Sequence, residues 1–386
     1  MLEYLSNDTR ILYRMIVTNF NKGWAWSDVI FRLRIPLAIC VVFIHFDIYN
    51  DNFIFYRDVV GKPEWVELVV RFFSNILPSV AVPLFFLFSG FLFFYGKDFN
   101  RSIYQHKILS RARSLLIPYL LWNLIAIVKE YATNYTHIEE LNLSWYNILM
   151  SFIDIYQHEG IVKRCSFDGA FYPIDLPLWF VRDLIIVVFF TPIIYWVILK
   201  CKIYSVLCLG FINVLYNIFF SSPNNGWPGQ LICAFFFFAW GAYYSINRQD
   251  FVMVFRKVRL APFIYVCLLI GDLLITSGDI VRTLIHQLQV LFGIITFVYM
   301  ASLFNNQINK WLVVSNSGFF IFALHYLIRG HIGIIMESLL SAPSNPVTVL
   351  AFYFLTPIVI CVVCIAIYQI TKRFFPRLCY LLSGGR

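Results

Sequence analysis

Charged residues are scarce in this chain of 386 residues. Asp, Glu, Lys and Arg together make up 13% of it, whereas hydrophobic residues make up 60% and aromatic residues 19%. One water-soluble core cannot hide so much apolar surface, so these proportions exclude a soluble fold and indicate a protein that spans a membrane several times. The net charge of +9 comes from short connections between apolar stretches, which argues against nucleic-acid binding.

Other features are also missing. The polar and apolar alternation of membrane β-barrels is absent, as are internal repeats and low-complexity tracts. The N-terminus has no short apolar stretch followed by a small-residue cleavage site, so we expect no cleaved signal peptide. Most of the nine cysteines lie in or beside apolar segments, where even the Cys361 and Cys364 pair predicts packing rather than redox chemistry. We expect no metal site.

Apolar segments of membrane-spanning length recur along the chain. Ten are found, at residues 30–49, 76–95, 114–130, 176–198, 202–220, 229–246, 260–277, 284–304, 312–338 and 347–370. We therefore predict an all-α integral membrane protein with about ten transmembrane helices, forming one transmembrane domain over residues 1–386. A long outer loop at about 129–175 could be a lid, an acceptor-recognition surface or a solvated linker.

The distribution of Lys and Arg predicts the orientation. With ten spans, 21 of the 30 basic residues fall on the side of the two termini and seven on the other, while Arg182 and Arg329 fall inside spans. Basic loops remain preferentially in the cytoplasm. Both termini are therefore predicted to be cytoplasmic.

Several ionisable residues are predicted to lie at membrane depth, where each charge costs at least ~2.5 kcal/mol. His45 follows Arg34 by eleven residues, roughly 16 Å deeper on nearly the same helix face. A similar depth is predicted for four further residues, Arg182, Asp183, Asp272 and His325. We predict a polar chamber slightly outward of mid-membrane, with Arg34 and the cluster from Lys107 to Arg113 at the cytoplasmic end of a path to it. Asp183 could instead only pair with Arg182, and Arg329 could extend toward the surface.

Four local patterns occur in order along the chain. They are Arg34 with ten residues before His45; Val82–Phe91 (VPLFFLFSGF) with Arg111-Ala112-Arg113 leading into Pro118-Tyr119; Pro177–Leu184 (PLWFVRDL); and Ser317–His325 (SGFFIFALH). Together they resemble the membrane-bound acyltransferase 3 family of O-acyltransferases. Family members often carry two arginines three residues apart before the Pro-Tyr turn, whereas this chain has Lys107, Arg111 and Arg113.

The resemblance implies transfer of an acyl group, most often acetyl, from cytoplasmic acyl-CoA to a hydroxyl of a cell-surface or lipid-linked glycan. His45 would be the general base, oriented by Asp272 or Asp183, and Arg182 or His325 could stabilise the oxyanion. Direct transfer and an acyl-histidine intermediate are both open. The implied acyl-CoA-binding residues are Arg34, Lys107, Arg111, Arg113 and Ser89, the basic ones meeting the CoA phosphates.

Alternatives remain at this stage. The donor could be succinyl-CoA. Charged residues at a shared depth also describe a secondary transporter or glycan flippase, although we find no inverted repeat. A third possibility is a non-catalytic partner in a polysaccharide-assembly complex. Besides the glycan, the expected partners are polysaccharide-assembly proteins, a second copy of the chain and the lipid bilayer. The resemblance also implies a location in the bacterial plasma (inner) membrane.

Overall fold

The computed structural model is helical throughout the part that it describes. It describes residues 25–46, 63–96, 99–133, 145–153, 172–220, 227–275, 280–304, 316–340 and 345–385, and it places none of them in a strand. Every one of the ten predicted apolar segments contains a helix. The all-α prediction is therefore confirmed for these residues.

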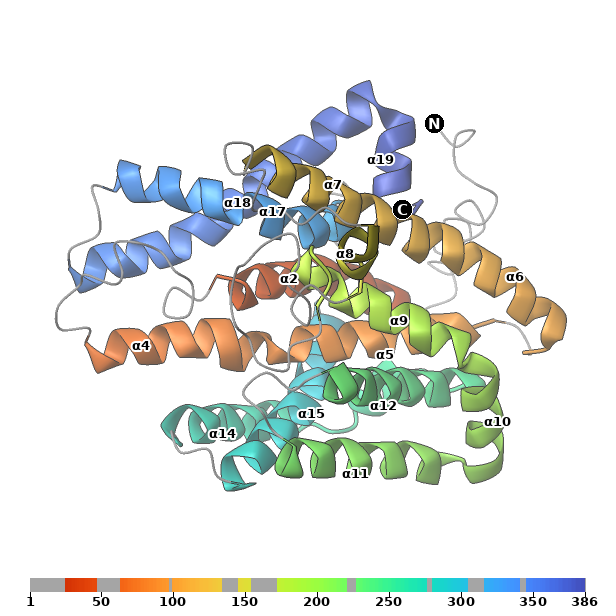
Figure 1. Cartoon of the computed structure of the whole chain (residues 1–386). Helices are drawn as coiled ribbons and strands as arrows, with labels where there is room; N and C mark the ends of the chain where they lie inside the picture. The colour runs from red at the N-terminus through yellow and green to blue at the C-terminus, as the bar shows by residue number, and fades with distance from the viewer. Residues whose placement is uncertain are drawn as a thin grey trace.

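Figure 1 shows most of the long helices running in a common direction, with α10 lying across their ends. The α-helices in chain order are α2 (Ala25–Ile44), α4 (Glu64–Arg71), α5 (Ala81–Phe94), α6 (Arg101–Arg111), α7 (Ile117–Thr133), α8 (Trp145–Met150), α9 (Trp179–Phe189), α10 (Thr191–Cys201), α11 (Ile203–Phe219), α12 (Trp227–Ile246), α13 (Phe251–Phe255), α14 (Ala261–Leu274), α15 (Ile280–Leu303), α17 (Gly318–Leu339), α18 (Pro346–Phe374) and α19 (Pro376–Leu382).

Six helical stretches in the described residues are long and apolar enough to cross a membrane: Glu64–Phe94, Arg101–Thr133, Pro228–Ile246, Ile280–Leu303, Gly318–Leu339 and Pro346–Phe374. The pair Leu176–Phe189 and Thr191–Cys201, bent by 64°, makes a seventh if it counts as one span. Helices α11 and α14 are apolar but shorter. About ten spans and two cytoplasmic termini therefore remain predictions.

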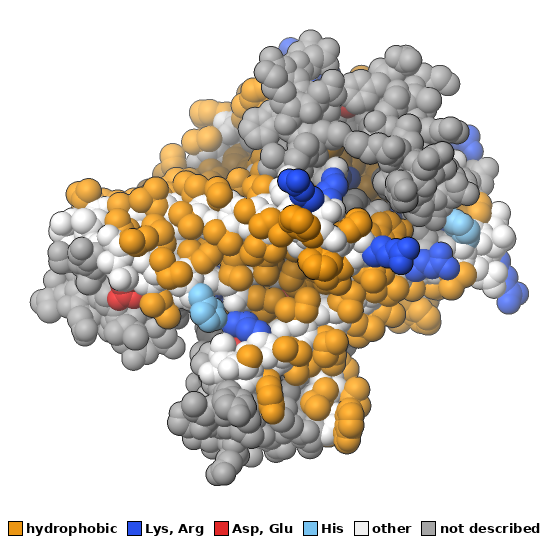
Figure 2. All heavy atoms as spheres, turned by 90° about the horizontal axis from the view of Figure 1, so that it is seen from above, with side chains coloured by type: hydrophobic (Ala, Val, Ile, Leu, Met, Phe, Trp, Pro, Cys, Tyr) orange, Lys and Arg blue, Asp and Glu red, His pale blue; other side chains and the backbone are white. Residues whose placement is uncertain are grey.

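The outer surface carries the apolar residues that a membrane requires. Many large hydrophobic side chains are exposed on α7, α11, α14 and α18, among them Leu124, Phe211, Phe263 and Val362. Figure 2 shows hydrophobic side chains spread across the visible face, with Lys and Arg side chains mainly toward one end. Water would not stabilise such a surface, whereas lipid would.

Two glycines allow α5 and α12 to pack backbone against backbone. A Cβ atom at Gly90 would lie 2.0 Å from the Phe238 carbonyl oxygen, and one at Gly241 would lie 1.9 Å from the Leu87 carbonyl oxygen. Small residues at helix crossings permit this close approach within membranes. The two helices lie side by side in Figure 1 and form a rigid centre for the fold.

The helix before α5 is irregular where it passes the end of α2. Between α4 and α5 the chain forms a π-helical turn at Phe72–Ile76 and a 3-10 turn at Leu77–Val80. Ser74, buried in the π turn, shares a hydrogen bond of 2.7 Å with the Tyr353 hydroxyl and lies 3.4 Å from the Phe46 carbonyl oxygen. This turn therefore connects α18 to the residue that follows His45.

Candidate functional site

The structure brings two histidines together at the end of α2. His45 follows the last residue of α2, and His325 lies in the middle of α17. Their ring centroids are 5.4 Å apart and the rings are tilted by 37°. His45 is partly buried and His325 is fully buried. Two candidates from distant parts of the sequence thus form one histidine pair.

The hydrogen bonding of His325 identifies its neutral tautomer. Its Nδ1 atom lies 3.0 Å from the Ile321 carbonyl oxygen, one turn earlier in α17. A carbonyl oxygen can only accept, so Nδ1 carries the proton and Nε2 of the neutral ring holds a lone pair. This Nε2 atom is buried and has no hydrogen-bond partner among the residues that the structure describes. A buried lone pair of this kind is available to accept a hydrogen bond or a proton.

Arg329 and Tyr326 hold His45 from the α17 side, and we call these two residues the clamp. Arg329 Nη1 donates a hydrogen bond to the His45 carbonyl oxygen. Its guanidinium carbon lies over the Tyr326 ring, 4.3 Å from the centroid. The Tyr326 ring in turn meets the His45 ring edge to face, with centroids 5.6 Å apart. The clamp thus fixes both the backbone and the ring of His45, and Arg329 is itself partly buried.

Arg34 and His45 are linked to the same neighbouring helix. Arg34 lies in the middle of α2, where an added Cβ on Gly318, the first residue of α17, would lie 3.8 Å from the Arg34 carbonyl oxygen and 4.0 Å from its Cβ. Helices α2 and α17 therefore run alongside each other in the same direction, Arg34 beside the start of α17 and His45 beside its middle. The predicted Arg34 to His45 line faces this helix.

The other predicted CoA-binding residues lie on α5 and on the run from α6 to α7. Lys107 donates a hydrogen bond to the Phe93 carbonyl oxygen, and its Nζ lies 5.1 Å from the Phe93 ring centroid. It therefore neutralises the negative C-terminal end of α5, a structural role. Arg111 and Ser89 are partly buried, and Arg113 is exposed.

Arg182 and Asp183 form a second, separate pair on α9. Arg182 Nε donates to Asp183 Oδ1 over 2.9 Å, and Arg182 Nη1 donates to the Ile153 carbonyl oxygen over 3.0 Å. Both side chains are buried. The neighbouring Phe180 ring packs edge to face on Phe322 of α17, with centroids 5.7 Å apart, which places α9 beside the helix that carries His325. The pairing alternative for Asp183 is thus observed.

Two described parts of the predicted outer loop, at residues 151–153 and 174–175, pack into the protein. Three successive carbonyl oxygens, those of residues 151–153, accept hydrogen bonds from the Ile174 backbone, the Tyr119 hydroxyl and Arg182. Asp175 is completely buried, and neither of its carboxyl oxygens has a hydrogen-bond partner in the described ranges. Burial raises the pKa of this carboxyl well above its ordinary value, and Lys129 offsets part of the effect.

Asp272 belongs to a third group of residues, distinct from the histidine pair. Its Oδ2 lies 2.7 Å from His286 Nδ1 and its Oδ1 lies 3.6 Å from Arg282 Nε, both on α15. Arg71 of α4 donates to the carbonyl oxygens of Asp272 and Ile275 at the end of α14. These contacts join three helix ends. The single chamber expected from depth alone is divided into three groups, and the contacts of Asp272 do not include His45.

Some residues in these groups were missed in the sequence. Tyr326 and His286 fall within predicted spans but stood out from no pattern, and Asp175 lies inside a predicted loop. Tyr326 could have been found because it directly follows His325. In the part of the chain that the structure describes, no group of three or more His, Cys, Asp or Glu residues is placed to hold a metal ion.

Comparison with known proteins identifies the family. Residues 30–368 match the Acyl_transf_3 family, described as an acyltransferase domain. The succinoglycan biosynthesis protein ExoH of Rhizobium meliloti (strain 1021) is 24% identical over 366 residues, covering 92% of this chain and 91% of its own. No solved structure matches. Because the family match covers most of the chain and includes Arg34, His45 and His325, the protein belongs to the acyltransferase 3 family.

Proposed function

We propose that the protein transfers an acyl group, acetyl in the first instance, from a cytoplasmic acyl-CoA to a hydroxyl of a cell-surface or lipid-linked glycan. The family supports acyl transfer, and the relative named for succinoglycan biosynthesis supports a bacterial exopolysaccharide as the acceptor. The protein would act in the plasma membrane, with its donor on one side and its acceptor on the other. The observation that carries the proposal is the His45 and His325 pair at the end of α2, the helix that also carries Arg34.

The chemistry requires a proton acceptor beside the reacting hydroxyl. His45 takes the hydroxyl proton while the oxygen attacks the thioester carbonyl carbon. The carbon–sulfur bond then breaks, the thiolate takes the proton back from the imidazolium, and an ester and free CoA result. In this direct path no protein bond to the acyl group forms. An acyl-histidine path would place the same acyl group on His45 first.

His325 is proposed to stabilise the charged form of His45. Its Nε2 lone pair can accept an N–H hydrogen bond from the His45 imidazolium after a small ring rotation, because the centroids are 5.4 Å apart. This differs from the oxyanion role expected for His325. The orienting role expected for Asp272 or Asp183 passes to the clamp, since the ion pairs of those carboxylates are with other residues. Arg182 and Asp183 remain candidates for contact with the acceptor.

At the donor end, Arg34, Arg111 and Arg113 are proposed to meet the phosphates of CoA through charge-assisted hydrogen bonds. Ser89 stays a candidate for the same ligand. Lys107 is the weakest of the set because its amine is already bonded to the end of α5.

The test uses the purified full chain in lipid vesicles, with acetyl-CoA or succinyl-CoA and a polysaccharide acceptor. Consumption of the thioester and acylation of the glycan are measured together. We expect acceptor-dependent release of CoA, abolished in His45→Ala, with the variant still inserting in the membrane. Movement of a glycan across the vesicle without thioester consumption would instead support the transporter alternative. A fully active His45→Ala would reject the mechanism.

A further inference from the structure

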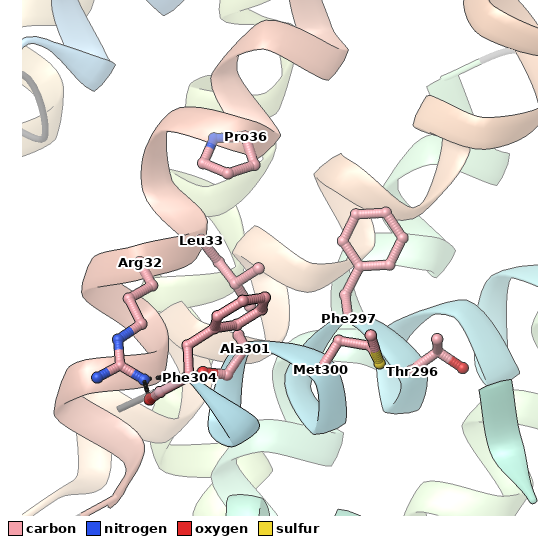
Figure 3. Close-up of a pocket in the computed structure, with 8 residues that line it drawn as sticks. All are labelled: Arg32, Leu33, Pro36, Thr296, Phe297, Met300, Ala301 and Phe304. Atoms are coloured by element: carbon pink, nitrogen blue, oxygen red, sulfur yellow. Dashed lines mark hydrogen bonds between the residues drawn. The ribbon is translucent and has the colours of Figure 1, made fainter. Parts of the chain in front are cut away.

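A groove separate from the histidine pair lies between α2 and α15. Its volume is about 300 Å³, and it is lined by Arg32, Leu33, Pro36, Thr296, Phe297, Met300, Ala301 and Phe304. Figure 3 shows the side chains from the two helices facing one another across it. Arg32 is the one charged residue in this lining, and most of the others are apolar.

The groove is on the opposite side of α2 from the Arg34 to His45 line. Arg32 precedes Arg34 by two residues, which corresponds to about 200° around a helix. Arg32 bonds to α15, whereas the Arg34 backbone lies against α17. A ligand of this groove would therefore occupy a place other than the proposed path of the acyl donor.

The groove opens toward the surface that faces lipid. Among its lining residues Phe304 is 67% exposed and Met300 is 44% exposed, and Pro36 is also exposed. Arg32 lies beside the end of α15, while Thr296 lies eight residues before Phe304, about 12 Å further along the helix. One end is therefore cationic and near a helix terminus, and the rest is an apolar channel.

Two polar groups in the lining have unused hydrogen-bonding capacity. Arg32 Nη1 donates to the carbonyl oxygens of Ala301 and Phe304. Within the described residues its Nε and Nη2 atoms have no hydrogen bond besides these, and Asp28, one turn earlier on α2, interacts with Arg32 through charge. The Thr296 hydroxyl is buried and has no partner in the same part of the chain. Thr296 lies five residues before Ala301 and eight before Phe304, so the two groups are separated by about 7.5 to 12 Å along α15.

We propose that this groove binds an anionic membrane phospholipid. The lipid phosphate bonds to the free face of the Arg32 guanidinium, the Thr296 hydroxyl donates to an ester carbonyl, and an acyl chain fills the apolar channel. An ester carbonyl lies a few bonds from the phosphate of such a lipid, which matches the spacing of the two protein groups. A phospholipid supplies an anionic phosphate for the cationic end of the groove and an acyl chain for its open apolar side. A soluble anion would leave the channel empty. Binding at this site does not depend on acyl transfer.

The experiment measures lipids retained by the purified full chain in native mass spectrometry. The probes are phosphatidylglycerol and phosphatidylcholine with identical acyl chains. We expect one phosphatidylglycerol to be retained at concentrations where phosphatidylcholine is not. Arg32→Gln should lower phosphatidylglycerol retention about tenfold, since one charged contact is lost, and Arg32→Lys should preserve most of it. Thr296→Val should reduce phosphatidylglycerol retention about threefold.

Matched controls exist in the same chain. Thr356→Val removes another buried hydroxyl without a partner in the described residues, on α18, and Arg101→Gln removes an exposed arginine on α6, which packs beside α9. Neither should change lipid retention. Ala301→Leu keeps the charge but narrows the channel, and it should also reduce retention. Equal retention of both lipids by the wild type, or unchanged retention in Arg32→Gln and Thr296→Val, overturns the proposal. Preferential retention of a polyprenyl phosphate overturns it as well.

Discussion

Two polar groups of this protein each contain a histidine, and the two histidines have different partners. His45 is held by a cation and an aromatic ring, and its neighbour His325 has a buried lone pair. His286 is instead bonded at Nδ1 to the buried carboxylate of Asp272, beside Arg282. A carboxylate and an arginine that pair with a histidine neutralise one another and fasten helix ends. Among the residues that the structure describes, no carboxylate forms an ion pair with His45 or His325, and Nε2 of His325 remains available for proton transfer.

The largest expected effect comes from His45→Ala. If this imidazole takes the hydroxyl proton, the rate of glycan acylation should fall by a factor of about 10³, within the usual range for loss of a general base. The measurement is initial rate of ester formation in vesicles at saturating acyl-CoA. Asp272→Asn is the control variant. A comparable loss of acylation rate in that variant would show that the Asp272 group and the histidine pair do not differ in function.

The next effect concerns the clamp. Arg329→Gln removes the charge that lies over Tyr326 and weakens the hydrogen bond to the His45 carbonyl, so we expect kcat to fall about tenfold with KM for acyl-CoA unchanged. Arg329→Lys should recover part of the loss. A general structural defect in Arg329→Gln would also alter KM and thermal stability. If Arg329 does not position His45, kcat should stay at the wild-type value, which would contradict the prediction.

A smaller effect on activity is expected for Asp272→Asn. The carboxylate is 1% exposed and is shared by Arg282 and His286, so its neutralisation should lower the free energy of unfolding by about 1–3 kcal/mol. Acyl transfer per folded molecule should stay within about threefold of wild type. Thermal unfolding in detergent gives the first quantity, and activity normalised to folded protein gives the second.

The smallest effect is expected for His286→Gln. This side chain is 35% exposed, and the substitution can keep a hydrogen bond to Asp272, so we expect a loss of stability of about 0.5–1 kcal/mol and unchanged acylation. A large loss of acylation here would place this histidine in the reaction and would reverse the comparison.

The sequence predicted the helices well because membrane helices depend on hydropathy, which is local. Each apolar segment from residue 30 to residue 370 contains a helix, and the spacing from Arg34 to His45 placed both on one helix. The helices extend further than the apolar windows, as at Glu64–Phe94, because polar residues continue a helix beyond the lipid. The bend of 64° after Phe189 was not predicted.

The grouping of site residues could not be predicted in full. Depth along a span fixes one coordinate, but the neighbours of each helix and the direction of each side chain decide which groups meet. His45 and His325 meet because α2 and α17 pack together, whereas Asp272 faces α15 and α4 at a similar predicted depth. Asp175 was placed in an outer loop because nothing in the local sequence indicates that the chain returns inside.

The π turn at Phe72–Ile76 determines how the two halves of its helix are rotated relative to each other. Such a turn accommodates one additional residue within a helix. Upstream of it, Arg71 reaches the end of α14, and downstream, Gly90 is locked against α12. Deleting one residue of the turn would rotate the upstream half by about 100° relative to the downstream half. Arg71 would then leave α14, while the contact between Gly90 and α12 persisted. The extra residue therefore allows the contacts at one end of the helix to change without a change at the other end.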